Sequence, residues 1–414
     1  MENGKVKLSA SRRLRRAGVK IGKTFATKGL QNMIILFALL VLILIFYLLN
    51  PNFLNRYNIV SMAQSLAPYA ILALGVTFVI ATGGIDLSIG TVCIASAVVA
   101  GHLYSKGFVP LWATIPLMIL IGAFFGFING FLIAKLKVPA FIATLGTMML
   151  SRGLSAIIVV VPNIFYPTGS WYNEVFSNYK SFPIGLVWVV GFMLLCMYFM
   201  YKNKIGRYIL SIGSNEEATR LSGINTDKYK MIAYIISGIG AGVAAIFWSA
   251  SFTTVAAATG NGYELDAIAG VYIGGTSAAG GIASVPGSVI GSMMLVVIRS
   301  GLNFVLAKFQ FNVNATYVTY VLTGVIVVVA VLMDIMKNKR AAKVKLLTPA
   351  QELKKSYKER KEQLEFKLDE VLSDKSLSSS DRLDESAKLR KEIEIAKVEY
   401  KTGLENLKKQ PKAQ

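Results

Sequence analysis

The stretch ATGGIDLSIG (residues 81–90) ends a long apolar run and places one carboxylate, Asp86, directly after two glycines. An ionisable side chain at membrane depth is costly, so its presence needs a physical reason. Gly83 and Gly84 can end a helix because glycine adopts left-handed backbone, and Asp86 can accept hydrogen bonds from the free amides of the next helix. The stretch predicts a helix break, and two interpretations of Asp86 stay open, a structural cap or a functional group.

The composition is that of a polytopic membrane protein. Of the 414 residues, 54% are hydrophobic, and the charges are crowded into a few segments. The net charge of +21 does not indicate nucleic acid, because the basic residues flank apolar segments and form no basic face. Cys93 and Cys196 lie in apolar runs and His102 is the single histidine, which excludes a disulfide framework and a histidine or cysteine metal site.

Apolar segments long enough to cross a bilayer, about 20 residues each, recur along the chain. They fall at 31–49, 58–82, 87–105, 110–134, 139–161, 183–201, 229–256, 264–281, 284–306 and 314–336. The sequence therefore predicts an all-α membrane protein with about ten transmembrane helices in residues 31–336. The boundaries near 82–87 and 256–284 are the least defined, because glycine-rich breaks there leave short or irregular helices.

The basic residues predict the orientation. Residues 1–30 hold nine lysines and arginines and lead into the first apolar run with no small-residue cleavage site, so we expect an uncleaved first span. Other basic segments fall on the same side, and by the positive-inside rule both termini are expected in the cytoplasm. Residues 1–30 are interpreted as a basic segment beside membrane lipid. Their run GVKIGKT (18–24) lacks the glycine spacing of a phosphate-binding loop, so it does not predict ATP binding by this chain.

A second stretch, ATGNGYELDAIAG (258–270), echoes the first. Both contain Ala-Thr-Gly, another glycine and then an acidic residue before leucine, so Glu264 corresponds to Asp86. Gly260 and Gly262 are accordingly the second pair of helix-breaking glycines. Because the preceding spans enter the membrane from opposite sides, the echo is what an inverted repeat of spans 2–5 and 7–10 would produce.

Polar residues inside the spans are candidates for lining a translocation path. Arg152 and Arg299 lie within predicted spans, where they either reach a headgroup or a carbonyl or face a polar substrate. A weaker echo between residues 128–134 and 302–307 pairs Asn129 with Asn303. Glu264 and Asp266 share the two interpretations of Asp86. The candidate lining residues are Asp86, Asn129, Arg152, Glu264, Arg299 and Asn303.

Residues 202–228 are the one long internal loop on the cytoplasmic side. Ser214 and Glu217 have capping-box spacing, and Gly223 lies where a C-terminal cap belongs. This pattern predicts a helix of about two turns. Such a helix is too short to be stable alone, so it docks either on this protein's own inner face or on a partner.

Four stretches resemble the integral-membrane permeases of bacterial ABC sugar importers of the ribose/galactose/xylose class. They are GGIDLSIG (83–90), INGFLIAKLKVPAFIATLGTM (128–148), IGRYILSIGSNEEATRLSGIN (205–225) and YELDAIAGVYIGGTSAAGGIASVPGSVIG (263–291). The resemblance covers residues 31–336, and it implies a permease that imports a monosaccharide, with ribose favoured, by alternating access. Alternatives are a nucleoside or branched-chain amino acid ABC permease and an ion-coupled secondary transporter.

The resemblance also implies partners. These are a cytoplasmic ABC ATPase that carries ATP and magnesium, an extracytoplasmic sugar-binding protein and a second permease copy, identical or related, in a bacterial inner membrane. It implies no catalytic residue and no cofactor in this chain. The predicted short helix would be the coupling helix that contacts the ATPase, through Ser214, Asn215, Glu216, Glu217, Ala218, Arg220, Leu221, Gly223 and Ile224.

Residues 337–414 extend past the last predicted span and are rich in lysine and glutamate. Apolar residues at three- and four-residue spacings on both sides of SDKSLSSSD (373–381) predict a cytoplasmic helical hairpin. The alternative is a partly disordered tail. A membrane-anchored interaction protein that works through this tail is a further rival interpretation.

Overall fold

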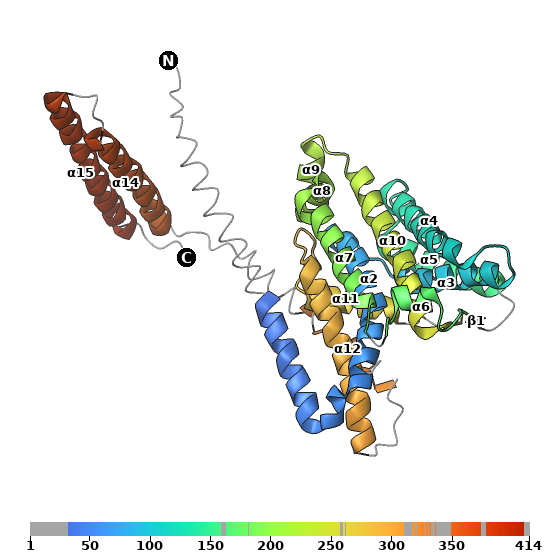
Figure 1. Ribbon diagram of the computed structural model, residues 1–414. Helices are drawn as coiled ribbons and strands as arrows, with labels where there is room; N and C mark the ends of the chain where they lie inside the picture. Colours follow the sequence, from blue (N-terminus) through green and yellow to red (C-terminus); the bar gives the residue numbers. More distant parts are fainter. Residues whose placement is uncertain are drawn as a thin grey trace. The chain divides into compact units, whose positions relative to one another are not determined.

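The computed structural model (Figure 1) describes residues 32–158, 163–180, 182–256, 260, 262–309, 349–373 and 378–409, with parts of 317–336. The chain divides into two units, Met1–Lys337 and Asn338–Gln414. Seven helices among the described residues are long and apolar enough to cross a membrane: Asn32–Leu49, Arg56–Ala81, Leu111–Ala134, Ala140–Ile158, Gly185–Lys202, Thr226–Phe252 and Val285–Lys308. The prediction of an all-α, multi-span membrane protein is confirmed.

The labelled elements follow in chain order. They are η1 (Pro51–Leu54), α2 (Arg56–Ala81), α3 (Ile89–Ser105), η2 (Leu111–Ala113), α4 (Thr114–Ala134), α5 (Ala140–Ile158), β1 (Ile164–Phe165), α6 (Trp171–Phe176), α7 (Gly185–Met197), η3 (Tyr198–Lys202), α8 (Lys204–Ser214), α9 (Glu216–Leu221), α10 (Thr226–Phe252), β2 (Thr254–Val255), α11 (Tyr263–Ile273), α12 (Val285–Lys308), α14 (Pro349–Ser373) and α15 (Ser379–Lys409). The two short strands pair antiparallel, with Ile164 opposite Val255.

Glycines set the closest helix contacts in the first unit. A Cβ added at Gly126 of α4 would lie 3.1 Å from the Cα of Gly238 in α10, and one added at Gly242 of α10 would lie 2.7 Å from the Cα of Ile119 in α4. Small residues at matching positions let two helices in a membrane approach until their backbones touch. Helix α10 therefore packs directly on α4, while its other neighbours include the largely buried α2.

The predicted span 264–281 is wrong as a full crossing. The 11 residues of α11 extend about 16 Å, whereas the hydrocarbon core is about 30 Å thick. The helix ends at Ile273 because glycines follow, and Gly275, Gly280 and Gly281 adopt positive φ values of 87°, 83° and 75°. The last predicted span, 314–336, is described only in part, and the basic segment 1–30 with its GVKIGKT run lies outside the described residues.

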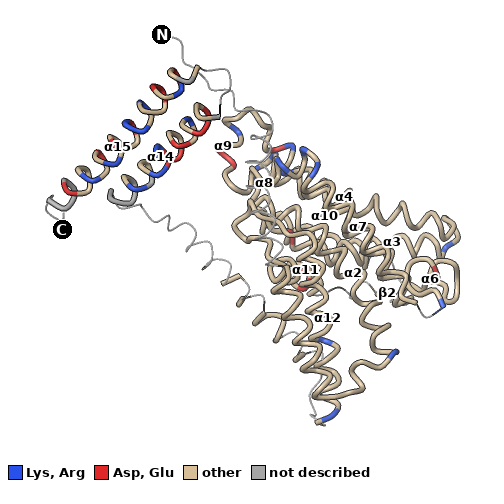
Figure 2. Tube along the Cα trace, turned by 60° about the vertical axis from the view of Figure 1, so that its left-hand side comes forward, with Lys and Arg blue, Asp and Glu red and all other residues tan. Residues whose placement is uncertain are grey.

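The second unit, taken by itself, contains α14 and α15 packed antiparallel. Tyr357 and Tyr400 stack with their ring centroids 4.6 Å apart. Arg360 forms an ion pair with Glu399 at 2.6 Å. Figure 2 shows lysine, arginine, aspartate and glutamate along both helices, whereas most of the first unit carries none. This hairpin has the solvated, charged exterior of a soluble element.

Candidate functional site

The first break is a buried hydrogen-bonded cluster around Asp86, which is 1% exposed. Its Oδ1 accepts from the backbone amide of Ser88 at 3.0 Å and from the Ser88 hydroxyl at 2.7 Å, and its Oδ2 accepts from the Ser237 hydroxyl of α10 at 2.8 Å. Asn129 of α4 donates to the Ser88 hydroxyl at 2.8 Å. Gly83, two residues after the end of α2, has a φ of 79°, a conformation that glycine adopts readily. The geometry supports the structural interpretation of Asp86, since each carboxylate oxygen has a donor.

The second break is built differently. Gly260 and Gly262 both have positive φ, 97° and 88°. The Glu264 carboxylate accepts from the amide of Gly262 at 3.2 Å. Arg152 of α5 interacts favourably with Glu264 through their opposite charges. Both glycines lie after the end of α10 at Phe252, with Gly262 as the N-cap residue of α11, and Glu264 hydrogen-bonds the backbone beside them.

Arg299 of α12 is held by two neighbours. Its guanidinium forms an ion pair with Asp266 of α11, and it donates to the Tyr69 hydroxyl of α2 at 2.8 Å. The guanidinium carbon also lies 5.2 Å from the centre of the Tyr69 ring, within cation–π range. The charge of Arg299 is therefore balanced by Asp266 within the described residues.

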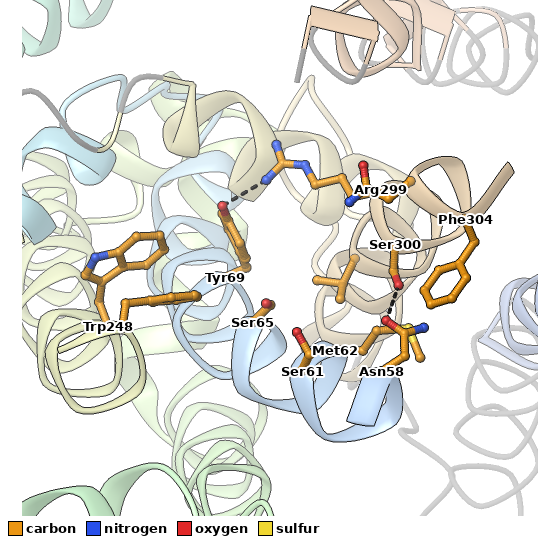
Figure 3. A pocket seen from close by; sticks show the side chains of 12 residues that line it. Asn58, Ser61, Met62, Ser65, Tyr69, Trp248, Arg299, Ser300 and Phe304 are labelled. Carbon is orange, nitrogen blue, oxygen red and sulfur yellow. Dashed lines mark hydrogen bonds between the residues drawn. The ribbon is translucent and has the colours of Figure 1, made fainter. Parts of the chain in front are cut away.

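A cavity of about 340 Å³ lies beside this arginine, between α2, α10 and α12 (Figure 3). Figure 3 shows the Ser61 and Ser65 side chains between Asn58 and Tyr69 on α2, with Trp248 at one side and Arg299, Ser300 and Phe304 at the other. The described residues that line the cavity are Asn58, Ser61, Met62, Ser65, Tyr69, Trp248, Phe252, Val296, Arg299, Ser300, Asn303 and Phe304. Polar groups and aromatic rings thus surround one space.

The structure separates the candidate lining residues. Arg299 and Asn303 line the cavity. Asp86 and Asn129 belong to the first break, and Glu264 belongs to the second, where Arg152 is its electrostatic partner. A role for these residues in transport stays a prediction.

Sequence reasoning missed the polar face of α2. Asn58, Ser61, Ser65 and Tyr69 follow one another at intervals of three, four and four residues, which places them on one side of a helix. A polar stripe inside an apolar span is visible in the sequence. The prediction selected mainly charged residues within the spans, because burial of a charge is the most costly, and it did not include uncharged serines.

The other candidate surface is formed by α8 and α9. The predicted cap is corrected by one residue: Asn215, and not Ser214, accepts from the Ala218 amide, at 2.9 Å. Ser214 instead ends α8, where its hydroxyl donates to the Leu210 carbonyl at 2.9 Å. The predicted helix end is confirmed, because Gly223 has a φ of 80° and donates to the Arg220 carbonyl.

Helix α8 was not predicted, although the isoleucines at 205, 209 and 212 recur at helical spacing. Together with α9 it borders a groove of about 400 Å³. The groove is lined by Leu210, Ser211, Ser214, Asn215, Ala218, Thr219, Ser222 and Ile224. Beside it, Leu221 is 86% exposed.

One ion pair ties α9 to the start of α10, and a second lies within α9. Glu216 contacts Lys230 at 2.6 Å and Arg220 at 3.1 Å. Partial burial disfavours the ionised form of Glu216, but these cations outweigh that effect and lower the pKa of its carboxyl below the ordinary value. Lys137, at the end of α4, binds Asp227 at 2.6 Å. Helix α9 is therefore attached to α10 rather than loosely tethered.

Comparison with known proteins identifies the chain. The family described as "Branched-chain amino acid transport system / permease component" matches residues 58–331. The chain belongs to this permease family. Its members are subunits of binding-protein-dependent ABC import systems, so the permease is a multi-pass inner-membrane protein. The match ends before α14, so the C-terminal hairpin is additional to the family region.

Several curated relatives of the permease have sugar-related names. The ribose import permease protein RbsC of Escherichia coli strain K12 is 37% identical over 330 residues, which cover 77% of this chain and 98% of that protein. RbsC of Bacillus subtilis is 35% identical over 304 residues, covering 72% and 91%. The L-arabinose transport system permease protein AraH of Escherichia coli strain K12 is 31% identical over 308 residues, covering 74% and 91%. No solved structure matches the permease.

Proposed function

We propose that this permease imports a monosaccharide of the ribose type as the membrane-spanning subunit of an ABC importer. The observation that carries the proposal is the similarity to ribose import permeases, which extends over 98% of the Escherichia coli protein. A fructose import permease protein, FruG of Bifidobacterium longum, is also 36% identical over 273 residues, covering 63% of this chain and 78% of that protein. The recurrence of sugars among these names favours a sugar over a nucleoside or a branched-chain amino acid.

We infer the orientation from charge. With both termini in the cytoplasm, α9 lies on the cytoplasmic side, and the cavity lies toward the outside. The cavity borders the first turns of α2 and the last turns of α10 and α12. In this orientation these turns are the external parts of all three helices, which supports the placement. An extracytoplasmic binding protein would deliver sugar on that side, and a second permease copy would complete the path.

Helix α9 is the proposed coupling helix. An exposed leucine beside a groove suits an ATPase surface that receives a short helix. The ATPase would bind ATP and magnesium, and the ion pairs of Glu216 would pass its movement on to α10. Among the described residues no cluster of histidine, cysteine, aspartate and glutamate could hold a metal ion.

The test is co-purification of the permease with the ATPase and binding protein encoded beside it, followed by ATPase assays in nanodiscs with pentoses, hexoses and leucine. We expect hydrolysis to rise only with sugar-loaded binding protein. Leu221→Glu should lose the ATPase. Phe108→Glu is the matched control, because Phe108 is 75% exposed but follows α3 at the opposite side.

Either of two results would contradict the proposal. Retention of the ATPase by Leu221→Glu would remove α9 from the interface. Uptake that follows a proton or sodium gradient, with no ATPase bound, would establish a secondary transporter instead.

A further inference from the structure

We propose that the cavity between α2, α10 and α12 is a binding subsite for a single neutral sugar ring within the permease itself. The inference rests on the proposed function, and it adds a location and a chemical selectivity that an import permease need not have. It predicts that the membrane subunit, and not only the external binding protein, distinguishes a sugar from a charged solute.

The charge of the cavity is balanced. Arg299 is the one charged side chain among the described residues that line it, and its guanidinium is already paired with Asp266. The same guanidinium donates to Tyr69. A carboxylate or phosphate entering the cavity would bring a second negative charge to a guanidinium that Asp266, only 3% exposed, already neutralises. Neutral ligands meet no such cost.

Polar groups are available on one wall. Figure 3 shows the Ser61 and Ser65 hydroxyls on the face of α2 that borders the cavity. Neither hydroxyl has a hydrogen-bond partner within the described part of the chain, whereas the neighbouring Asn58 already accepts from Ser300 at 2.7 Å. A ligand rich in hydroxyl groups can donate to and accept from both serines.

Aromatic rings occupy another wall. The rings of Tyr69 and Trp248 meet edge to face with their centroids 6.3 Å apart. The ring centroids of Trp248 and Phe252 are 4.3 Å apart. A sugar ring has C–H faces that pack on aromatic surface and a hydroxylated rim that needs hydrogen bonds. This combination of rings and hydroxyls is the one that the cavity offers, whereas the side chain of an aliphatic amino acid has no group that could hydrogen-bond the serines.

The size of the cavity limits the ligand. A volume of about 340 Å³ lies near the lower end of small-ligand pockets, which run from about 300 to 1,000 Å³. Two hydrogen bonds connect α2 to α12 and fix the separation of these walls. Arg299 donates to Tyr69, and Ser300 donates to Asn58. The space therefore suits one ring rather than a disaccharide.

The experiment measures binding to the permease without its binding protein. The permease in nanodiscs is titrated with D-ribose, leucine and ribose 5-phosphate, and saturation-transfer NMR reports the contact of each compound with protein. We expect a signal from D-ribose alone. Ser65→Ala should weaken it roughly two- to tenfold, as for loss of one hydrogen bond, and Ser65→Leu should remove it by filling the cavity.

The control is Gly191→Leu on α7, where an added side chain meets open space. It should leave the D-ribose signal unchanged. Equal signals from D-ribose and leucine, or a D-ribose signal that survives Ser65→Leu, would overturn the subsite.

A parallel uptake assay with the whole complex separates this failure from failure of the proposed function. Ribose uptake at wild-type rate by Ser65→Leu would refute the subsite while leaving the importer intact. Absence of uptake of any monosaccharide by the wild-type complex would refute both.

Discussion

Replacement of Gly238 by alanine should destabilise the whole transmembrane unit, because this glycine lies at the contact between α4 and α10. An added Cβ would lie 2.9 Å from both the Cα and the N of Gly126, and closer still to the carbonyl oxygen of Gly122. Ordinary contacts of a Cβ begin at 3.4 Å, so the helices must separate by at least 3.4 − 2.9 = 0.5 Å. Overpacking of this kind costs roughly 1–3 kcal/mol, and no flexible side chain is present to absorb it.

The assay uses the two buried cysteines. Cys93 and Cys196 are 0% and 3% exposed, so a thiol-reactive dye reports unfolding of the purified permease as it is heated. Gly146→Ala in α5 is the matched control, because a Cβ there meets nothing within 4 Å. Alanine favours helix over glycine by up to about 1 kcal/mol, so the control should be neutral or stabilised. A Gly238→Ala variant that melts at or above the control temperature would refute the backbone contact.

Three further predictions follow from the structure. Asp86→Ala should lower the free energy of unfolding by roughly 1–3 kcal/mol more than Asp86→Asn, because alanine leaves the Ser88 and Ser237 donors without an acceptor; the same dye assay should show a lower Tm for the alanine variant, and equal melting temperatures would contradict the prediction. Because the pKa of Glu216 is lowered from 4.5, its ion pairs should persist above that value and break as the pH falls through the lowered pKa; a spin label at Glu217 should gain mobility there, and Glu216→Gln should abolish the transition. Deletion of residues 345–414 should leave sugar uptake unchanged, since the family match ends at residue 331; loss of uptake would make the tail the functional part.

Much of the architecture could be predicted because membrane segments are encoded locally. Continuous apolar runs of sufficient length determine most of the spans, and glycines with positive φ lie in both segments that precede a helix restart, at Gly83 and at Gly260 and Gly262. The C-terminal cap at Gly223 could likewise be predicted from the local sequence, since it depends only on the left-handed backbone conformation that glycine adopts. The early end of α11 at Ile273 could not be predicted from hydropathy. Hydropathy continues through small residues, but glycines with positive φ end α11 early.

The cavity could be predicted only in part, because it depends on which helices meet. Arg299 and Asn303 stood out as polar residues in an apolar span, yet nothing local indicates that Arg299 pairs with Asp266 or that Tyr69 accepts from it. The N-cap at Asn215 was missed for a different reason. Ser214 and Asn215 are both good caps, and the choice between them depended on whether α8 continued to residue 214.

Helix α10 runs without interruption from the ion pair with α9 to the wall of the cavity. Its 27 residues extend about 40 Å, with Lys230 beside α9 near one end and Trp248 in the cavity wall near the other. Near its middle, Ser237 is bonded to Asp86 and Gly238 touches α4. Further close backbone contacts at Met231, Gly240 and Gly242 hold α10 against α4 and α2 over about three turns, so a displacement at one of its ends has to move the packed helices together.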